Sequence, residues 1–205
     1  MEYLPPVTSQ PPQLQGALKY QDPAYAAGFD AKRKDDPKRV LAKNAIKGML
    51  ADLAEKSLVL DAGCGSGLLF EFFIEKRFTV CGIDLSQALL DEAAKKLDHY
   101  KATGRLKSNF TLAVGNVCKL ELADKCCDAS VMCDLTRWLS PAECQQAMRE
   151  FQRVAKRRII WTARVANHPH ARAVELFESA LNGWKITRNE AGIDLDYRIL
   201  MAEPT

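Results

Sequence analysis

Short apolar runs alternate with longer amphipathic segments along most of this 205-residue chain. Apolar runs that are bounded by turn residues have the length of buried strands, whereas the longer segments have the spacing of amphipathic helices. The predicted strands are residues 57–61, 78–83, 110–114, 129–133 and 158–164. The predicted helices are residues 36–53, 68–76, 86–100, 140–154 and 169–181. Strands that alternate with helices in this way predict a mainly parallel sheet with helices packed on it.

The C-terminal end of the chain breaks this alternation. Residues 184–188 and 196–202 both read as strands, no helix separates them, and Ala191-Gly192 lies near the turn between them. This pattern predicts an antiparallel hairpin at the edge of the sheet. We therefore expect an α/β fold with a doubly wound, mainly parallel seven-stranded sheet and an antiparallel C-terminal hairpin.

The N-terminal region differs in composition from the rest. Residues 1–16 contain four prolines, three glutamines and one serine, which predicts a disordered Pro-rich arm. Residues 17–56 are expected to form a helical leader, and residues 57–205 the core of a single domain. In the leader, Tyr20, Tyr25 and Phe29 fall four to five residues apart, as on one face of a short helix.

Composition narrows the functional classes. The net charge of +3 is too small to imply a nucleic acid partner, and the basic segment at residues 32–39 is read as a solvated face. The seven cysteines lie mostly in apolar runs and include no zinc-type pair, so we expect buried thiols and no metal. Because we see no signal peptide and no apolar run of membrane-spanning length, we expect a cytoplasmic protein without a membrane partner.

The most informative stretch follows the first predicted strand. An apolar run ends in Asp61 and continues into three alternating glycines, and the next apolar run ends in Asp84, seventeen residues after Gly67. An α/β sheet builds a nucleoside site from elements in this order: a strand, a glycine turn, a helix, a second strand and an acid. In such a site the second acid accepts hydrogen bonds from the ribose hydroxyls. The GxGxG spacing differs from the dinucleotide fingerprint GxGxxG, and an acid at the mouth of the site favours a cation over a pyrophosphate.

The segment Asp61-Ala62-Gly63-Cys64-Gly65-Ser66-Gly67 resembles the first motif of the class I S-adenosylmethionine-dependent methyltransferases, E/D-x-G-x-G-x-G, at every defined position. The resemblance covers about residues 40–203. It implies a Rossmann-like fold, S-adenosylmethionine as cofactor and S-adenosylhomocysteine as product. It assigns the glycine loop to the methionine half of the cofactor, the second acid to the ribose and the following leucine to adenine. The residues so assigned are Asp61, Gly63, Cys64, Gly65, Gly67, Asp84 and Leu85. The alternative is another doubly wound nucleotide-binding domain.

Further cofactor contacts are expected where other strands end and in the leader. Asn116 follows the third strand and has a carbonyl oxygen that can accept a hydrogen bond from the adenine amino group, as in related enzymes; the alternative is a turn asparagine. Val117 and Cys133 are expected beside the cofactor. The resemblance also suggests that the leader, through Tyr25, lies over the cofactor as a lid; the alternative is a surface helix packed on the core.

Candidate residues for the acceptor side follow the fourth and fifth strands. We expect Asp134 to orient the acceptor, Trp138 to wall its pocket and His168 to accept a proton near neutral pH. Related enzymes often carry a histidine where Trp138 stands, so a base at that position is in doubt. Arg137, Arg164 and His170 are predicted to contact the substrate. Turn, cap and packing roles are the alternatives for these residues.

The resulting hypothesis is a methyltransferase that transfers a methyl group in line to a small molecule. No appended RNA-binding module is recognised, and the Asp/Asn-Pro-Pro-Tyr/Phe motif of many nucleic acid enzymes is absent. Three alternatives stay open. They are a methyltransferase that acts on tRNA or DNA, a non-catalytic subunit that binds S-adenosylmethionine, and an enzyme with other chemistry on that cofactor, such as aminopropyl transfer. The sequence predicts neither the acceptor nor the oligomeric state.

Overall fold

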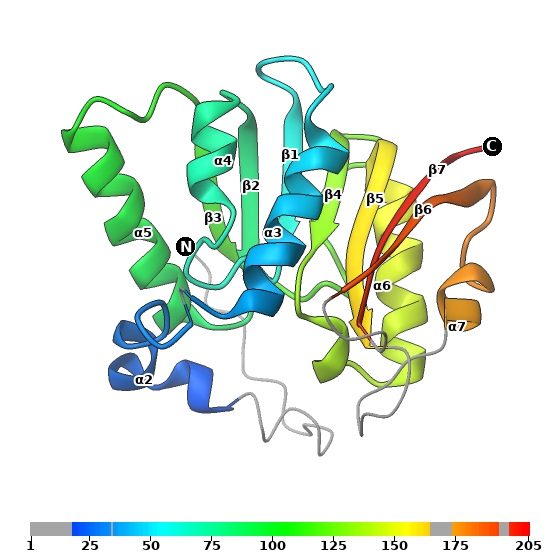
Figure 1. Cartoon of the computed structure of the whole chain (residues 1–205), viewed down its shortest axis with the longest axis horizontal. Coiled ribbons are helices and arrows are strands. Elements are labelled where there is room, and N and C mark those ends of the chain that lie inside the picture. The colour runs from blue at the N-terminus through cyan, green and yellow to red at the C-terminus, as the bar shows by residue number, and fades with distance from the viewer. Residues whose placement is uncertain (1–17, 34, 165–173, 193–196) are drawn as a thin grey trace.

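A seven-stranded sheet with the order β3-β2-β1-β4-β5-β7-β6 forms the centre of the computed structural model, which describes residues 18–33, 35–164, 174–192 and 197–205 (Figure 1). The strands are β1 Leu58–Ala62, β2 Thr79–Asp84, β3 Phe110–Val114, β4 Cys127–Met132, β5 Ala155–Arg164, β6 Trp184–Ala191 and β7 Tyr197–Pro204. Strands β1 to β5 pair in parallel, whereas β7 runs antiparallel to both β5 and β6. The predicted fold class and the C-terminal hairpin are therefore confirmed.

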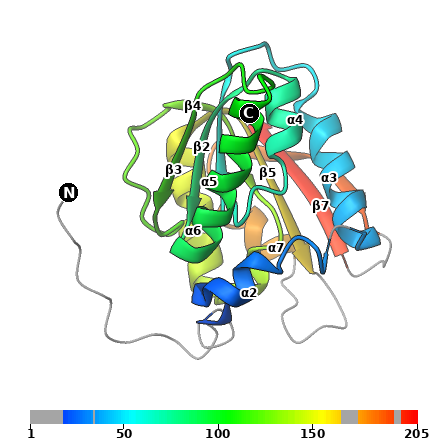
Figure 2. The ribbon, with the colours of Figure 1, turned by 90° about the vertical axis from the view of Figure 1, so that its left-hand side faces the viewer.

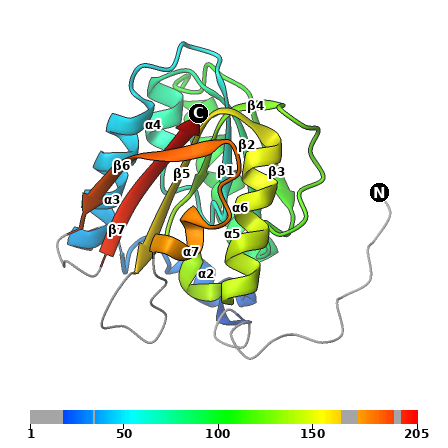
Figure 3. The same ribbon diagram turned by 90° about the vertical axis from the view of Figure 1, so that its right-hand side faces the viewer.

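Helices cover both faces of the sheet. They are η1 Leu18–Gln21, α2 Pro23–Ala27, α3 Pro37–Leu50, α4 Phe70–Glu75, α5 Gln87–Ala102, η2 Thr136–Trp138, α6 Pro141–Val154 and α7 Val174–Glu178. Edge-on views show α3 and α4 on one face and α6 on the other (Figures 2 and 3). Successive residues of a strand point to opposite faces. Accordingly Val59 packs with residues of α3 and α4 while Leu60 packs with residues of α6, and both are fully buried.

Two helix starts follow the capping chemistry that their sequence predicts. The Ser86 hydroxyl accepts a hydrogen bond from the Leu89 amide at 3.1 Å and caps α5. Ser140 and Glu143 form a reciprocal capping box at the start of α6, with Pro141 in its first turn. These caps fix the points at which the chain leaves β2 and β4 to begin the next helix.

Element ends differ from the predictions by a few residues. Strand β5 begins at Ala155, directly after α6, and β6 continues to Ala191. Both extensions are polar stretches that pair with neighbouring strands, so the hydrophobic pattern does not show them. Helix α3 ends at Leu50, and Leu53 is buried in the turn that follows. The Pro-rich arm and the first part of the helix predicted at residues 169–181 lie outside the described residues.

The topology places a crevice at the carboxyl ends of the central strands. Strand β1 lies between β2 and β4. The chain adds β2 and β3 on one side of β1 and then adds β4 and β5 on the other side, so the strand order switches between β1 and β4. Figure 1 shows α2 and the start of α3 beside these strand ends.

In the part of the chain that the structure describes, no helix combines the length and the apolar character that crossing a membrane requires.

Candidate functional site

The glycine loop after β1 is tied to the end of β2. The amides of Gly63 and Cys64 donate to the Ile83 carbonyl at 2.7 and 3.1 Å. Gly67 has a φ of +80°, and a Cβ at this position would lie 2.5 Å from the Phe70 ring, so the turn that leads into α4 needs glycine there. Gly65 has a φ of +53°, which favours glycine, and a Cβ at this position would only touch the Leu89 side chain at 3.8 Å. The loop therefore offers bare backbone to a ligand.

Asp84 connects this loop to the start of α5. One carboxylate oxygen accepts a hydrogen bond from the Gly65 amide at 2.8 Å, and the other accepts from the Ser86 amide at 2.8 Å. Burial raises the pKa of Asp84, and the backbone hydrogen bonds oppose that shift. Each oxygen keeps a further lone pair. Asp84 therefore holds the loop in place and can still accept hydrogen bonds from two ligand hydroxyls.

Asp61 is a buried acid without a cation. Its exposed fraction is 3 %, and no hydrogen-bond donor or cationic side chain pairs with its carboxylate among the residues that the structure describes. Burial, with the nearby Asp84 charge as the second cause, raises the pKa of Asp61 to about 7. A buried charge without a partner is costly. The carboxylate is thus poised to bind a cationic group from a ligand.

A cavity of about 50 Å³ lies beside Asp61. Its lining comes from the glycine loop and the start of α4, from Cys133 and Asp134 after β4, and from two leader residues, Phe29 and Arg39. Ligand pockets are usually about 300–1,000 Å³. The cavity is therefore much smaller than a nucleoside-sized ligand, and the leader side chains fill the remainder of the crevice.

Polar contacts fasten the leader to the cofactor loop. One oxygen of Asp30 accepts a hydrogen bond from the Ser66 hydroxyl at 2.5 Å, and the other pairs with the Lys96 ammonium at 2.7 Å. The Ser86 hydroxyl donates to the carbonyl of Tyr20. Because these partners belong to the glycine loop and to α5, the leader lies directly over the strand ends.

Aromatic rings give the leader its own small core. Tyr20 makes edge contacts with Tyr25, Phe29 and Trp138 at centroid distances of 5.5, 5.7 and 5.6 Å. The three leader aromatics cluster, but they come from η1, α2 and the turn after α2 and not from one face of a single short helix as the spacing predicts. Phe29 lines the cavity, whereas Tyr25 does not and instead accepts a hydrogen bond from Arg33 at 3.3 Å. Trp138 packs against the leader rather than beneath a core helix.

Asp134 already has several partners. It lies in the left-handed backbone region at φ +60°, and its amide donates to the Thr162 hydroxyl at 2.8 Å. The Tyr197 hydroxyl donates to its carboxylate at 3.1 Å, and the Arg39 guanidinium lies 3.5 Å away. Because these groups hold Asp134 beside the cavity, its geometry suits a positioning role more directly than proton transfer.

Three other predicted cofactor contacts, Leu85, Asn116 and Val117, do not line this cavity, whereas Cys133 does. Leu85 is 47 % exposed, which leaves an apolar surface free after β2. The Asn116 side-chain oxygen accepts a hydrogen bond from the Cys118 amide at 2.8 Å, as in an asparagine turn. Val117 is buried among side chains on the α6 side of the sheet. Cys133 lines the cavity, and burial raises the pKa of its thiol well above the usual value.

The predicted acceptor residues divide into two groups. Arg137 lies with its guanidinium 4.6 Å from the Trp138 ring centre, and Arg164 lies 5.6 Å from that of Tyr197. The Nε atom of each arginine is buried without a hydrogen-bond acceptor. His168 and His170 lie outside the described residues, so their predicted roles stay predictions.

Sequence reasoning missed Arg39 and the pairing role of Asp30. Arg39 belongs to the basic segment that was read as a solvated face, yet its side chain is only 13 % exposed and its guanidinium lies 5.2 Å from the Phe29 ring centre. The sequence around Arg39 does not indicate that its side chain is buried, because its acidic partner Asp134 is distant in the sequence. All seven cysteines are free thiols, and no group of three potential metal ligands occurs among the described residues.

Comparisons with known proteins agree with this geometry. Residues 59–158 match the family model described as "Methyltransferase domain". The chain is 32% identical over 83 residues to the Bacillus subtilis (strain 168) protein named "Putative methyltransferase YqeM". That match covers 40% of this chain and 34% of the relative, so it spans about a third of the relative's length.

Solved structures share the fold over nearly the whole chain. Magnesium protoporphyrin IX methyltransferase (ChlM) from Synechocystis PCC 6803, crystallised with bound SAM, is similar with a TM-score of 0.75 and 20% identity. The similarity covers 98% of this chain and 100% of that one. A SAM-dependent methyltransferase from Aquifex aeolicus has a TM-score of 0.66 and 22% identity, over 90% of this chain and 99% of the other. The glycine motif, the domain match over residues 59–158 and the shared fold together support a class I S-adenosylmethionine-dependent methyltransferase.

Proposed function

We propose that this protein transfers the methyl group of S-adenosylmethionine to a small-molecule acceptor. The observation that carries the proposal is Asp61, a buried carboxylate with a pKa of about 7 and no cationic partner among the described residues. S-adenosylmethionine has an ammonium group that would supply the missing charge, whereas a pyrophosphate cofactor would add a like charge at this point.

The remaining groups of the site fit the same ligand. Asp84 has lone pairs free for two ribose hydroxyls, and the exposed Leu85 offers an apolar surface for the adenine ring. Gly65 has no Cβ, so its backbone can approach the methionine half closely. These features support the predicted roles of the glycine loop and of both acids.

The leader has to move for the ligand to enter. Phe29 and Arg39 reduce the cavity to about 50 Å³, which is far below the size of a bound nucleoside. The contacts of Asp30 with Ser66 and Lys96 hold the leader in this position. We therefore infer that the leader is a lid, which opens on binding and closes again over the cofactor.

Bound S-adenosylmethionine would supply an electrophilic methyl group on its sulfonium. The residues of this chain would orient that ligand through Asp61 and Asp84, exclude water with Phe29, and hold the acceptor near the Asp134 side of the cavity. Such positioning can account for a large part of the rate, because it converts a bimolecular reaction into one between held partners. Proton removal from the acceptor would then need no dedicated base among the described residues.

The position of the leader is the reason for proposing a small-molecule acceptor. It covers the strand ends, and Arg33 and Arg39 of its basic segment pack on Phe29 instead of forming a solvated track for phosphates. The closed crevice favours an acceptor that can be enclosed. A nucleic acid acceptor remains the alternative hypothesis, and a non-catalytic subunit that binds the cofactor is the alternative from another functional class.

The experiment is a methyl-transfer assay with the full chain and methyl-labelled S-adenosylmethionine. Labelled S-adenosylmethionine is incubated with a small-molecule metabolite extract and, in parallel, with total RNA and genomic DNA. Label in the metabolite fraction supports the proposal, and its absence from an Asp84→Ala control shows that the site is responsible. Label confined to RNA or DNA contradicts the small-molecule acceptor. Cofactor binding without label in any fraction favours the non-catalytic subunit.

A further inference from the structure

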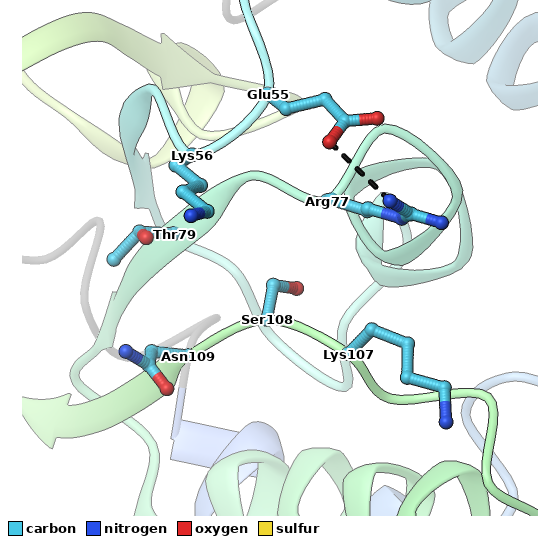
Figure 4. A pocket seen from close by; sticks show the side chains of 7 residues that line it. All are labelled: Glu55, Lys56, Arg77, Thr79, Lys107, Ser108 and Asn109. Atoms are coloured by element: carbon cyan, nitrogen blue, oxygen red, sulfur yellow. Dashed lines mark hydrogen bonds and ion pairs between the residues drawn. The ribbon is translucent and has the colours of Figure 1, made fainter.

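A second hollow lies at the opposite end of the sheet from the cofactor site. Its volume is about 550 Å³, and its lining comes from three turns that precede β1, β2 and β3. The lining residues are Glu55, Lys56, Arg77, Thr79, Lys107, Ser108 and Asn109 (Figure 4). Strand β1 separates this hollow from the glycine loop by about 16 Å of extended chain. The hollow is therefore distinct from the site described above.

Positive charge dominates the hollow. Lys56, Arg77 and Lys107 contribute three cations from three different turns, and Glu55 is the single acid among the lining residues. Glu55 pairs with Arg77 at 3.4 Å, as Figure 4 shows. The side-chain ammonium of neither lysine has a hydrogen-bond or ionic partner among the described residues. Two cations around one hollow are thus available for an anion.

Neutral donors lie between these cations. The Ser108 hydroxyl is buried and has no hydrogen-bond partner, although a buried hydroxyl normally has one. The side chains of Thr79 and Asn109 line the same hollow and have no side-chain hydrogen bonds among the described residues. Hydroxyl and amide donors beside ammonium groups are the combination that binds phosphate or carboxylate oxygens.

The backbone of two of the turns is held in a conformation that side chains disfavour. Lys56 has a φ of +66° and Arg77 a φ of +56°, and the Lys56 amide donates to the Arg77 carbonyl at 2.9 Å. Glycine or asparagine adopts this region at lower cost than a long side chain does. Arg77 takes this conformation just after α4, where its amide donates to the Ile74 carbonyl at 3.0 Å and the Phe78 amide donates to the Phe73 carbonyl at 2.9 Å. The helix end therefore accounts for the conformation of Arg77, and the hydrogen bond from Lys56 brings the two backbones together at the hollow.

We propose that this hollow binds a compact polyanion that carries two or more neighbouring phosphate groups, such as a pyrophosphate or a nucleoside diphosphate. The cations surround one hollow of ligand size rather than forming the extended stripe that nucleic acids need. The site lies at the amino ends of the strands, so its ligand does not touch the reacting atoms.

Inorganic pyrophosphate is the probe for this proposal. It is titrated calorimetrically into the full chain at low salt, with and without saturating S-adenosylmethionine. We expect binding of pyrophosphate in both cases. Lys56→Gln and Lys107→Gln should each weaken it about tenfold, and Ser108→Ala by about three- to tenfold, because each removes one donor to a charged group. The exposed Lys185 on β6 offers a matched control, and Lys185→Gln should leave the affinity unchanged.

Three results would overturn the proposal. The first is no pyrophosphate binding to the wild-type chain, and the second is an equal loss of affinity in the Lys185→Gln control. The third is a single-stranded RNA that binds with the same lysine dependence and more tightly than pyrophosphate. Because S-adenosylmethionine affinity is measured on the same variants, failure here is distinguishable from failure of the proposed function.

Discussion

Replacement of Asp61 by asparagine should stabilise the ligand-free protein and weaken cofactor binding at the same time. The carboxyl is fully buried, and its pKa of about 7 in the folded protein compares with 3.8 for the free side chain. An acid whose pKa is raised by folding binds protons more readily in the folded than in the unfolded chain. Asp61 therefore costs the fold no stability below about pH 4, and this cost grows as the pH rises to about 7.

The size of this effect follows from the shift. A difference of about three pKa units corresponds to roughly 4 kcal/mol of lost stability at pH 8. The asparagine amide also loses water on burial, so we expect Asp61→Asn to raise the free energy of unfolding by about 1–3 kcal/mol. For a chain of this length each kcal/mol raises Tm by about 2–4 °C. The same substitution removes a charge-assisted hydrogen bond and should weaken S-adenosylmethionine binding about 10- to 100-fold.

Thermal unfolding at pH 5 and pH 8, together with calorimetric titration, measures both effects. The gain in Tm should be larger at pH 8 than at pH 5. Wild-type affinity should also fall about fivefold from pH 7 to pH 6, because the ligand ammonium binds the ionised acid and the ionised fraction drops by that factor around a pKa of about 7. Asp98→Asn, at an exposed acid of α5, provides the control and should change neither quantity. A variant that is less stable than wild type, with unchanged cofactor affinity, would refute the reasoning about Asp61.

The remaining predictions concern the second acid, the lid and one ion pair. Asp84→Ala should weaken S-adenosylmethionine binding by about 1–3 kcal/mol in a calorimetric titration, because it removes the acceptor for the ribose hydroxyls and the tie to Gly65; unchanged affinity would exclude the ribose role. Asp30→Ala should release the leader and accelerate cofactor dissociation in stopped-flow experiments, and an unchanged rate would argue against a lid. The pKa of Asp52 is lowered to about 2 by its hydrogen bond to Arg158. This pair therefore stabilises the fold above about pH 4 and is lost as the pH falls towards 2, so Asp52→Asn should lower Tm at pH 7 but not at pH 2.

The sequence predicted the parts of this protein that depend on local pattern. The order of strands and helices follows from periodicity, and the glycine loop with Asp61 and Asp84 follows from residue spacing along one βαβ unit. Both acids lie at the carboxyl ends of adjacent strands, where topology requires them to be close.

Contacts between distant segments could not be predicted in this way. Arg39 meets Asp134 only because the leader folds back over the strand ends, and a basic residue in a polar segment carries no sign of burial. The spacing of the leader aromatics predicted a cluster but not that Phe29, rather than Tyr25, would reach the cavity. The second hollow combines three ordinary charged turns, each of which looks like a solvated loop when taken alone.

Calorimetric titration of the full chain with S-adenosylmethionine, S-adenosylhomocysteine and NADH tests the central claim most directly. The unpaired Asp61 carboxylate and the GxGxG loop predict micromolar binding of both adenosyl ligands and no binding of NADH, whose pyrophosphate would meet a buried acid. Binding of NADH, or no binding of either adenosyl ligand, would contradict the cofactor assignment on which the proposed function depends.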